Sequence, residues 1–144
     1  MTIAVVFPGQ GAQAAGLGQP WRGHASWSVV ERAEAALREP LAHLLLDAPA
    51  EDLARTREAQ LVVFLTSLVA WEAARPHVGE PVAFAGHSLG QLTALVAAGA
   101  LSVEDGARLA SHRAELTQRS ADRNPGRMAA LLGATLDQAE TACT

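Results

Sequence analysis

The chain has 144 residues, enough for one domain with a hydrophobic core and too few for two full domains. Hydrophobic residues make up 49% of it, which favours a folded globular protein over a disordered one. The formal net charge of −4 provides no basic surface of the kind that binds nucleic acid, so we expect no nucleic-acid partner.

The sequence also argues against a membrane, a metal and a disulfide. The first seven residues lack the positive charge of a signal peptide, and the longest apolar segment, residues 61–71, is interrupted by Thr66 and Ser67. The single cysteine, Cys143, cannot form an internal disulfide and fits a reducing compartment. The five histidines show no metal-ligand spacing. We expect a soluble, cytoplasmic protein without a metal or a bound cofactor.

Residues 3–7 are apolar and end at Pro8 and Gly9, which predicts a buried strand followed by a loop. The loop, residues 8–20, is rich in glycine, which suggests close backbone approach to a ligand or to another loop. Apolar spacing then predicts a helix over residues 28–38, with Ser26 or Ser28 as its N-cap. Residues 41–54 are ambiguous and favour short helical pieces around Pro49.

Residues 58–75 form the longest predicted helix. This segment is apolar on nearly all sides, so we expect it to be buried between other elements. Pro76 ends it.

The stretch that bears most on function is residues 86–90, which have the form Gly-x-Ser-x-Gly around Ser88. An apolar run at residues 81–85 predicts a buried strand before it, and residues 91–98 favour a helix after it. Strand, tight turn and helix form the context of a nucleophile elbow. Ser88 is then expected in a strained backbone conformation at a helix N-terminus, where free N–H groups favour negative charge. The alternative is a glycine-rich turn with an ordinary serine.

Ser102 is the predicted N-cap of a helix that runs to Arg119, with Asp105 in the place of the capping-box acid. A polar loop is expected at residues 122–126, a strand at 127–132 and a helix from Leu136 onward. Strands separated by helices predict an α/β layer architecture with parallel pairing. Three strands are too few for a closed α/β domain, so we expect part of a longer protein or one half of a split one.

Arg113 lies on an apolar stripe of this helix, between Leu109 and Leu116 on one side and Ala110 and Ala114 on the other. Polar residues occupy the predicted opposite face: Glu104, Arg108, Ser111, Glu115 and Arg119. An arginine within an apolar stripe needs an anion, and a bidentate substrate carboxylate would serve. From the pattern alone, an internal ion pair or a side chain that extends to solvent is favoured.

No general base for Ser88 is identifiable. Its neighbour His87 should point in a different direction, so we interpret it as a structural histidine that hydrogen-bonds within the turn. None of the other histidines and no acidic residue is recognisable as a member of a catalytic triad.

Residues 7–13, Phe-Pro-Gly-Gln-Gly-Ala-Gln, and residues 86–90 together resemble the malonyl-CoA:acyl-carrier-protein transacylase family, which includes the acyltransferase domains of polyketide synthases. Arg113 stands at the position of the family's carboxylate-binding arginine, and residues 128–133 resemble the first strand of its small ferredoxin-like lobe. The resemblance extends over essentially the whole chain but over only about the first half of a full-length member.

The resemblance implies an incomplete α/β-hydrolase-like large lobe over residues 1–126 and the start of the small lobe over residues 127–144. It implies that Ser88 is the acylated nucleophile and that the backbone N–H groups of Gln10 and Leu89 form the oxyanion hole. For the substrate it implies that Arg113 holds a malonyl-type carboxylate, with Gln60 and His87 also at the binding site.

The implied reaction moves a malonyl-type group from CoA to the phosphopantetheine thiol of an acyl carrier protein, in fatty acid or polyketide synthesis. The family's catalytic histidine lies in the second half of its fold, so the resemblance implies a complementary chain that supplies it. Without that chain, residues 1–144 are expected to be inactive. The sequence departs from the family at Leu61, Gln91 and Thr117, where proline, glutamate and methionine are usual.

Two alternatives stay open. A serine hydrolase, such as a thioesterase or lipase, shares the elbow but needs neither the Gln10 loop nor an inward arginine, and it uses water as the acceptor. A non-catalytic chain that folds or docks without turnover is also compatible with the sequence.

Overall fold

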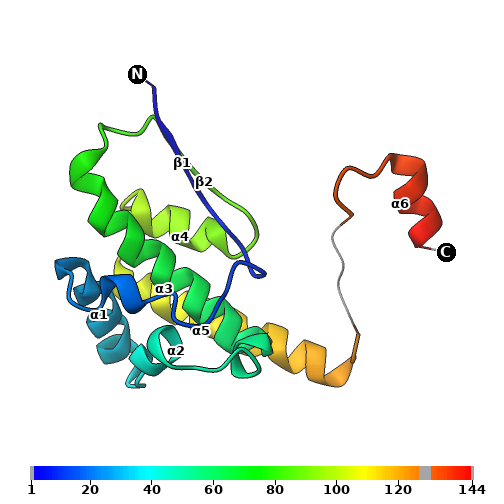
Figure 1. Ribbon diagram of the computed structural model, residues 1–144, viewed down its shortest axis with the longest axis horizontal. Coiled ribbons are helices and arrows are strands. Elements are labelled where there is room, and N and C mark those ends of the chain that lie inside the picture. Colours follow the sequence, from blue (N-terminus) through cyan, green and yellow to red (C-terminus); the bar gives the residue numbers. More distant parts are fainter. Residues whose placement is uncertain (1, 127–130, 144) are drawn as a thin grey trace.

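The structure is a computed structural model that describes residues 2–126 and 131–143. Its strands and helices follow the chain in the order β1 (Ala4–Phe7), α1 (Ser28–Leu37), α2 (Ala42–Leu46), α3 (Thr56–Ala74), β2 (Ala83–Gly86), α4 (Gly90–Ala97), α5 (Val103–Arg123) and α6 (Leu136–Ala142) (Figure 1). Four short 3-10 turns connect them: η1 (Gln19–Trp21), η2 (Ala25–Trp27), η3 (Asp52–Ala54) and η4 (Arg75–His77). The predicted α/β class and the short helical pieces between residues 41 and 54 are confirmed.

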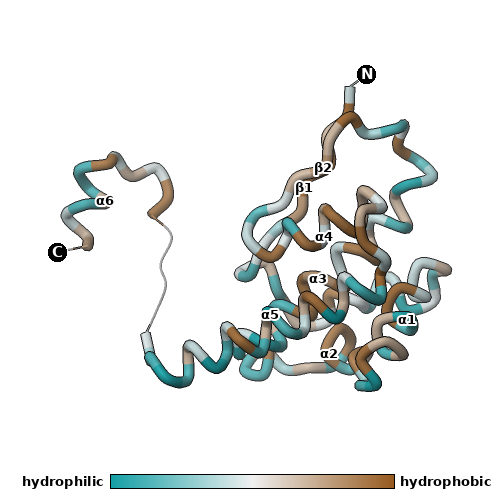
Figure 2. Tube along the Cα trace, turned by 180° about the vertical axis from the view of Figure 1, so that it is seen from behind, coloured by the Kyte–Doolittle hydropathy of each residue, from teal (hydrophilic) through white to brown (hydrophobic). Residues whose placement is uncertain are grey.

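Strands β1 and β2 pair in parallel, with Ala4 opposite Ala83 and Phe7 opposite Gly86. Helix α4 packs against both strands, and helices α1 to α5 lie to one side of them (Figures 1 and 2). The parallel pairing is therefore confirmed, but the expectation that both strands are buried is wrong. Val6 is 74% exposed and Val82 is 69% exposed. Apolar parallel strands are usually covered on both faces, and here the described residues cover only one.

Helix α3 is the centre of the hydrophobic core and packs against α1, α4 and α5. Its buried residues come from nearly all sides of the helix: Ala59, Gln60, Leu61, Val62, Val63, Phe64, Leu65, Leu68, Val69 and Trp71. The predicted long, buried helix is confirmed, with bounds that differ by one or two residues. Because α3 is enclosed, it provides a rigid support for any side chain that it directs toward its neighbours.

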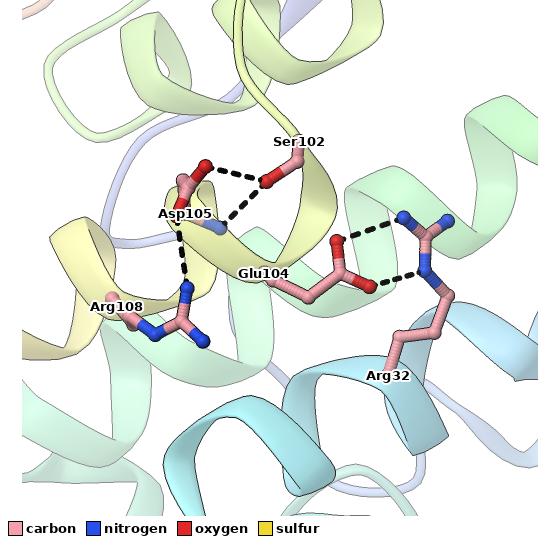
Figure 3. A network of polar contacts seen from close by, with 5 residues as sticks. All are labelled: Arg32, Ser102, Glu104, Asp105 and Arg108. Carbon is pink, nitrogen blue, oxygen red and sulfur yellow. Dashed lines mark hydrogen bonds and ion pairs between the residues drawn. The ribbon is translucent and has the colours of Figure 1, made fainter.

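Helix α5 is capped and tied to α1 at its N-terminus (Figure 3). The Ser102 hydroxyl accepts a hydrogen bond of 3.0 Å from the Asp105 N–H, which confirms the predicted N-cap. Arg108 pairs with Asp105 at 2.9 Å, and Arg32 of α1 donates to both carboxylate oxygens of Glu104 at 2.7 and 2.9 Å. The hydrogen bonds from Arg32 lower the pKa of Glu104 from 4.5 to about 2.

The predicted N-cap of α1 is wrong. Trp27 occupies the N-cap position without a side-chain hydrogen bond, because the turn η2 runs directly into α1. His24 instead caps η2, accepting a hydrogen bond of 3.1 Å from the Ser26 N–H. The Ser28 hydroxyl donates back to the Ala25 carbonyl at 3.0 Å. Both candidate serines are therefore engaged in the turn that precedes the helix.

The end of the chain differs from expectation in two places. Helix α5 continues to Arg123, so it includes the first residues of the predicted polar loop. Of the predicted strand, residues 127–130 lie outside the described part, and Leu131 and Leu132 are not in a strand. The predicted final helix is confirmed as α6, which opens with a capping box between Thr135 and Gln138.

Within residues 2–126 and 131–143, no helix is both long enough and apolar enough to cross a membrane. The same residues contain no group of three histidine, cysteine or acidic side chains arranged to hold a metal ion.

Candidate active site

Ser88 lies in the turn between β2, which ends at Gly86, and α4, which begins at Gly90. Its backbone φ is 52°, in the left-handed region that side-chain-bearing residues rarely adopt. This conformation costs on the order of 1–3 kcal/mol and persists only where the surrounding structure enforces it. The predicted strained serine in a strand–turn–helix elbow is therefore confirmed.

The elbow requires glycines because main-chain segments approach one another closely there, leaving no room for a Cβ atom. A Cβ at Gly86 would lie 1.9 Å from the Gly90 carbonyl carbon, and a Cβ at Gly90 would lie 2.4 Å from the Phe7 carbonyl oxygen. A Cβ at Gly9 would lie 2.7 Å from the His87 carbonyl oxygen. The His87 N–H also donates to the Phe7 carbonyl at 3.0 Å. These contacts place the loop after β1 directly against the elbow, as the glycine-rich loop predicted.

Two backbone amides beside the serine have no hydrogen-bond acceptor among the described residues. Neither the Leu89 N–H nor the Gln10 N–H donates a hydrogen bond within the described part of the chain. The next amides are occupied, since Gly90 N–H donates to the His87 carbonyl at 2.8 Å and Gln91 N–H donates to the Ser88 carbonyl at 3.2 Å. Free N–H groups at a helix N-terminus suit a developing oxyanion, and the assignment of Gln10 and Leu89 to that role stays a prediction.

Arg113 reaches Ser88 from helix α5. Its Nη2 donates a hydrogen bond of 2.8 Å to the Ser88 Oγ, and its Nη1 donates to Gln60 Oε1. The internal ion pair that the pattern alone favoured is wrong, because Arg113 has no carboxylate partner among the described residues. A cation without an acidic partner therefore lies against the candidate nucleophile.

The predicted apolar stripe around Arg113 is confirmed on one side, where Ala110 and Ala114 are buried, and wrong on the other. Leu109 and Leu116 are exposed, whereas the buried face of α5 consists of small residues and one valine: Val103, Gly106, Ala107, Ala110, Ser111 and Ala114. Ser111, which was expected on the polar face, is buried. Small side chains let the helix approach its neighbours, and a Cβ at Gly106 would lie 2.3 Å from Val96 Cγ2. Arg113 thus lies at the edge of the buried face.

Gln60 holds the other side of the guanidinium. It lies on α3 with 1% of its surface exposed, and its Nε2 donates a hydrogen bond of 2.7 Å to Thr117 Oγ1. The structure therefore joins Gln60 to Arg113, and the role of Gln60 in substrate binding stays a prediction. Thr117 was identified only as a departure from the family pattern. Its position one turn beyond Arg113 on the same helix is the one signal that could have linked it to the site.

His87 is exposed, and its imidazole makes no hydrogen bond within the described part of the chain. The predicted side-chain hydrogen bond within the turn is therefore wrong, and the residue is held through its backbone N–H instead. No histidine or carboxylate among residues 2–126 and 131–143 hydrogen-bonds to the Ser88 hydroxyl. The base that would deprotonate Ser88 is not identified in this part of the chain.

Comparison with known proteins agrees with this geometry. The acyl transferase domain family matches residues 4–143. A malonyl CoA-acyl carrier protein transacylase from Bacillus subtilis is 37% identical over 133 residues, which cover 91% of this chain and 42% of the relative.

Solved structures give the same result. The crystal structure of MCAT from Streptococcus pneumoniae matches with a TM-score of 0.83 and 32% identity, covering 97% of this chain and 46% of that one. A structure of a type II PKS acyl-carrier protein in complex with its malonyl-transacylase matches with a TM-score of 0.72 and 31% identity, covering 83% and 40%. This chain spans less than half the length of each of these relatives. By its sequence, its fold and its nucleophile elbow, the chain belongs to the acyl transferase domain family.

Proposed function

We propose that this chain forms the nucleophile- and carboxylate-binding part of a malonyl-type acyltransferase. One observation carries the proposal: the guanidinium of Arg113 lies 2.8 Å from the Ser88 Oγ and lacks a carboxylate partner among the described residues. A substrate bound to Ser88 through an acyl group would bring its free carboxylate next to this cation. Arginine suits that role because its planar fork binds a carboxylate through two parallel hydrogen bonds.

The proposed reaction has two half-reactions. Ser88 Oγ attacks the thioester carbonyl of malonyl-CoA, its proton passes to a general base, and the C–S bond breaks to release CoA as a thiol. The phosphopantetheine thiol of an acyl carrier protein then attacks the acyl-serine and restores the Ser88 hydroxyl. The N–H groups of Gln10 and Leu89 bind the oxyanion in both steps, and such a donor is typically worth about 100- to 1000-fold in rate.

The substrate site in this proposal includes Gln60, which holds Arg113, and His87 at the rim of the elbow. No cofactor or metal takes part. The acceptor is an acyl carrier protein, a proposal supported by the similarity to a malonyl-transacylase solved in complex with such a protein.

We further propose that residues 1–126 belong to an α/β-hydrolase-like large lobe and that residues 127–144 begin a ferredoxin-like small lobe. The rest of the sheet and the histidine base come from the remainder of the fold, either in the same longer protein or in a complementary polypeptide. Two facts support this: apolar side chains of β1 and the segment before β2 are exposed, and the relatives are more than twice as long as the matched region.

Intact mass spectrometry tests the proposal. The chain is incubated briefly with malonyl-CoA, alone and together with a co-expressed polypeptide that corresponds to the remainder of its relatives. We expect one malonyl adduct in the combined sample and none in Ser88→Ala, while the exposed Ser120→Ala keeps the adduct. An adduct that persists in Ser88→Ala removes Ser88 from the mechanism.

The same samples separate the proposal from its two rivals. Transfer of the adduct to a carrier-protein thiol supports the acyltransferase, whereas release of free malonate at the same rate without carrier protein supports a hydrolase. If no adduct forms in either sample, the chain is non-catalytic. Full turnover by the chain alone would overturn the need for a complementary polypeptide.

A further inference from the structure

Thr117 forms hydrogen bonds both to the backbone of its own helix and to the side chain of Gln60, which holds Arg113. Its Oγ1 lies 3.0 Å from the carbonyl oxygens of Arg113 and Ala114, one turn earlier on α5. The same oxygen lies 2.7 Å from Gln60 Nε2. A hydroxyl has a single hydrogen, and carbonyl oxygens can only accept, so that hydrogen is directed into the helix. Toward Gln60, Thr117 therefore acts as the acceptor.

This constraint fixes the orientation of the Gln60 amide. The side chain has 1% of its surface exposed, so both ends of the amide need partners within the protein. Its two neighbours have opposite requirements, since Thr117 accepts whereas the Arg113 guanidinium only donates. Both are satisfied in one orientation, with Nε2 toward Thr117 and Oε1 toward Arg113. The reverse orientation would set two donors against each other at the guanidinium.

The orientation of Gln60 in turn decides where the cation lies. With Nη1 held by Gln60 Oε1, the guanidinium plane directs Nη2 at the Ser88 Oγ. We propose that Thr117 is a positioning residue: it orients the Gln60 amide, aims Arg113 at the acyl group on Ser88, and so sets the preference for acyl groups that carry a free carboxylate. The last part of this inference rests on the proposed function; the positioning itself does not.

The experiment removes the Thr117 hydroxyl while it keeps the size and shape of the side chain nearly the same. Thr117→Val keeps the β-branched shape and loses the acceptor, whereas Thr117→Ser keeps the acceptor and loses a methyl group. A matched control is Thr66→Val on α3, because the buried Thr66 hydroxyl has no hydrogen-bond partner among the described residues. Two measurements are made on each variant: NMR of the side-chain N–H groups of Gln60 and Arg113 in the chain, and acylation kinetics with malonyl-CoA and acetyl-CoA in the complete protein.

We expect Thr117→Val to shift the Gln60 amide and Arg113 Nε–H resonances and to speed exchange of the amide protons with solvent. Thr117→Ser and Thr66→Val should leave these resonances and the exchange rate of the amide protons nearly unchanged. In kinetics, Thr117→Val should lower the ratio of kcat/KM for malonyl-CoA over acetyl-CoA by about tenfold, mainly through KM for malonyl-CoA, because a ground-state contact is lost. Thr117→Ser should stay within about threefold of the unaltered protein.

The two measurements distinguish failure of the positioning from failure of the proposed function. If the Gln60 and Arg113 resonances do not move in Thr117→Val, or move equally in Thr66→Val, the positioning role is overturned. If they move as expected but the unaltered protein has no malonyl preference, Thr117 still positions Arg113, and the proposed function fails instead. Equal kinetic losses for both acyl groups in Thr117→Val would overturn the link to specificity.

Discussion

On one side of Ser88 the candidate site is made of backbone, and on the other side it is made of side chains. The backbone side is the elbow and the loop after β1, where a Cβ on Gly86, Gly90 or Gly9 would overlap neighbouring main-chain atoms. The side-chain side is the chain of hydrogen bonds from Thr117 through Gln60 to Arg113. The backbone side depends on the absence of side chains at its glycines, and the side-chain side depends on the identity of three residues.

This difference separates two tasks. Free N–H groups near Ser88 can stabilise the oxyanion of any acyl group, because every thioester carbonyl develops the same charge. A guanidinium held by Gln60 interacts only with acyl groups that carry an anion. On the proposed function, the backbone side supplies the common chemistry and the side-chain side selects the substrate. Because the backbone side is tightly packed, substitutions of its glycines should affect folding. Substitutions of Arg113, Gln60 or Thr117 should affect the choice of acyl group.

The largest expected effect is on the backbone side. Gly86→Ala places a Cβ 1.9 Å from the Gly90 carbonyl carbon, where only backbone movement can relieve the overlap. We expect a loss of about 4 kcal/mol or more in the free energy of unfolding, measured by urea denaturation. Gly79→Ala is the control, since a Cβ there meets nothing within 4 Å, and it should change stability by less than about 1 kcal/mol. Equal stabilities of the two variants would show that the elbow is not tightly packed.

The second effect is on the side-chain side. Arg113→Ala should lower the rate of acylation by malonyl-CoA far more than by acetyl-CoA, with a difference of roughly 2–4 kcal/mol in transition-state stabilisation. Stopped-flow or quenched acylation assays with both substrates measure it. Arg108→Ala, on the same helix and paired with Asp105 at the surface, should leave the ratio unchanged. If both substrates lose rate equally in Arg113→Ala, the arginine supports the fold and does not select the acyl group.

The smallest effect concerns stability away from the site. The folded-state pKa of Glu104 is lowered from 4.5 to about 2, so its pairing with Arg32 stabilises the fold above about pH 4.5 and is lost as the pH falls toward 2. The side chains are 34% and 50% exposed, and solvent screening should limit the contribution to less than about 1 kcal/mol.

Glu104→Gln should remove this part of the acid dependence, measured by denaturation at pH 6, 4 and 3. Glu31→Gln on α1 is the control, because Glu31 has no ion-pair partner in the described part of the chain. Neither variant should alter the malonyl preference. A stability profile for Glu104→Gln that parallels that of the unaltered chain would show that the pair contributes nothing measurable.

The backbone side was largely predictable from the sequence because its signals are local. An apolar strand, a serine between two glycines and a helix-forming segment follow one another within a few residues. The positive φ of Ser88 is the strained conformation that this pattern predicted. The N-cap at Ser102 was predictable for the same reason. The N-cap of α1 was not, because a preceding turn, η2, engages both serines before the helix begins.

The side-chain side was less predictable because it depends on contacts between helices. Helical periodicity placed Ala110 and Ala114 correctly on the buried face of α5 but also placed Leu109 and Leu116 there, and these two are exposed because close approach to α3 and α4 requires small residues. The residues alone favoured an acidic partner or a solvent-directed side chain for Arg113 over a substrate carboxylate, and only the resemblance to a family reversed that order. The Gln60–Thr117 hydrogen bond joins two helices, and no spacing within one helix can indicate it.

The left-handed conformation of Ser88 also restricts which nucleophile could replace it during evolution. At a φ of 52° a β-branched side chain crowds the backbone, so threonine could supply a hydroxyl here only by distorting the elbow. Cysteine has the same branching as serine and fits the same turn. A protein with this elbow can therefore replace its serine nucleophile with cysteine by one substitution. Replacement with threonine would require the elbow to change conformation as well.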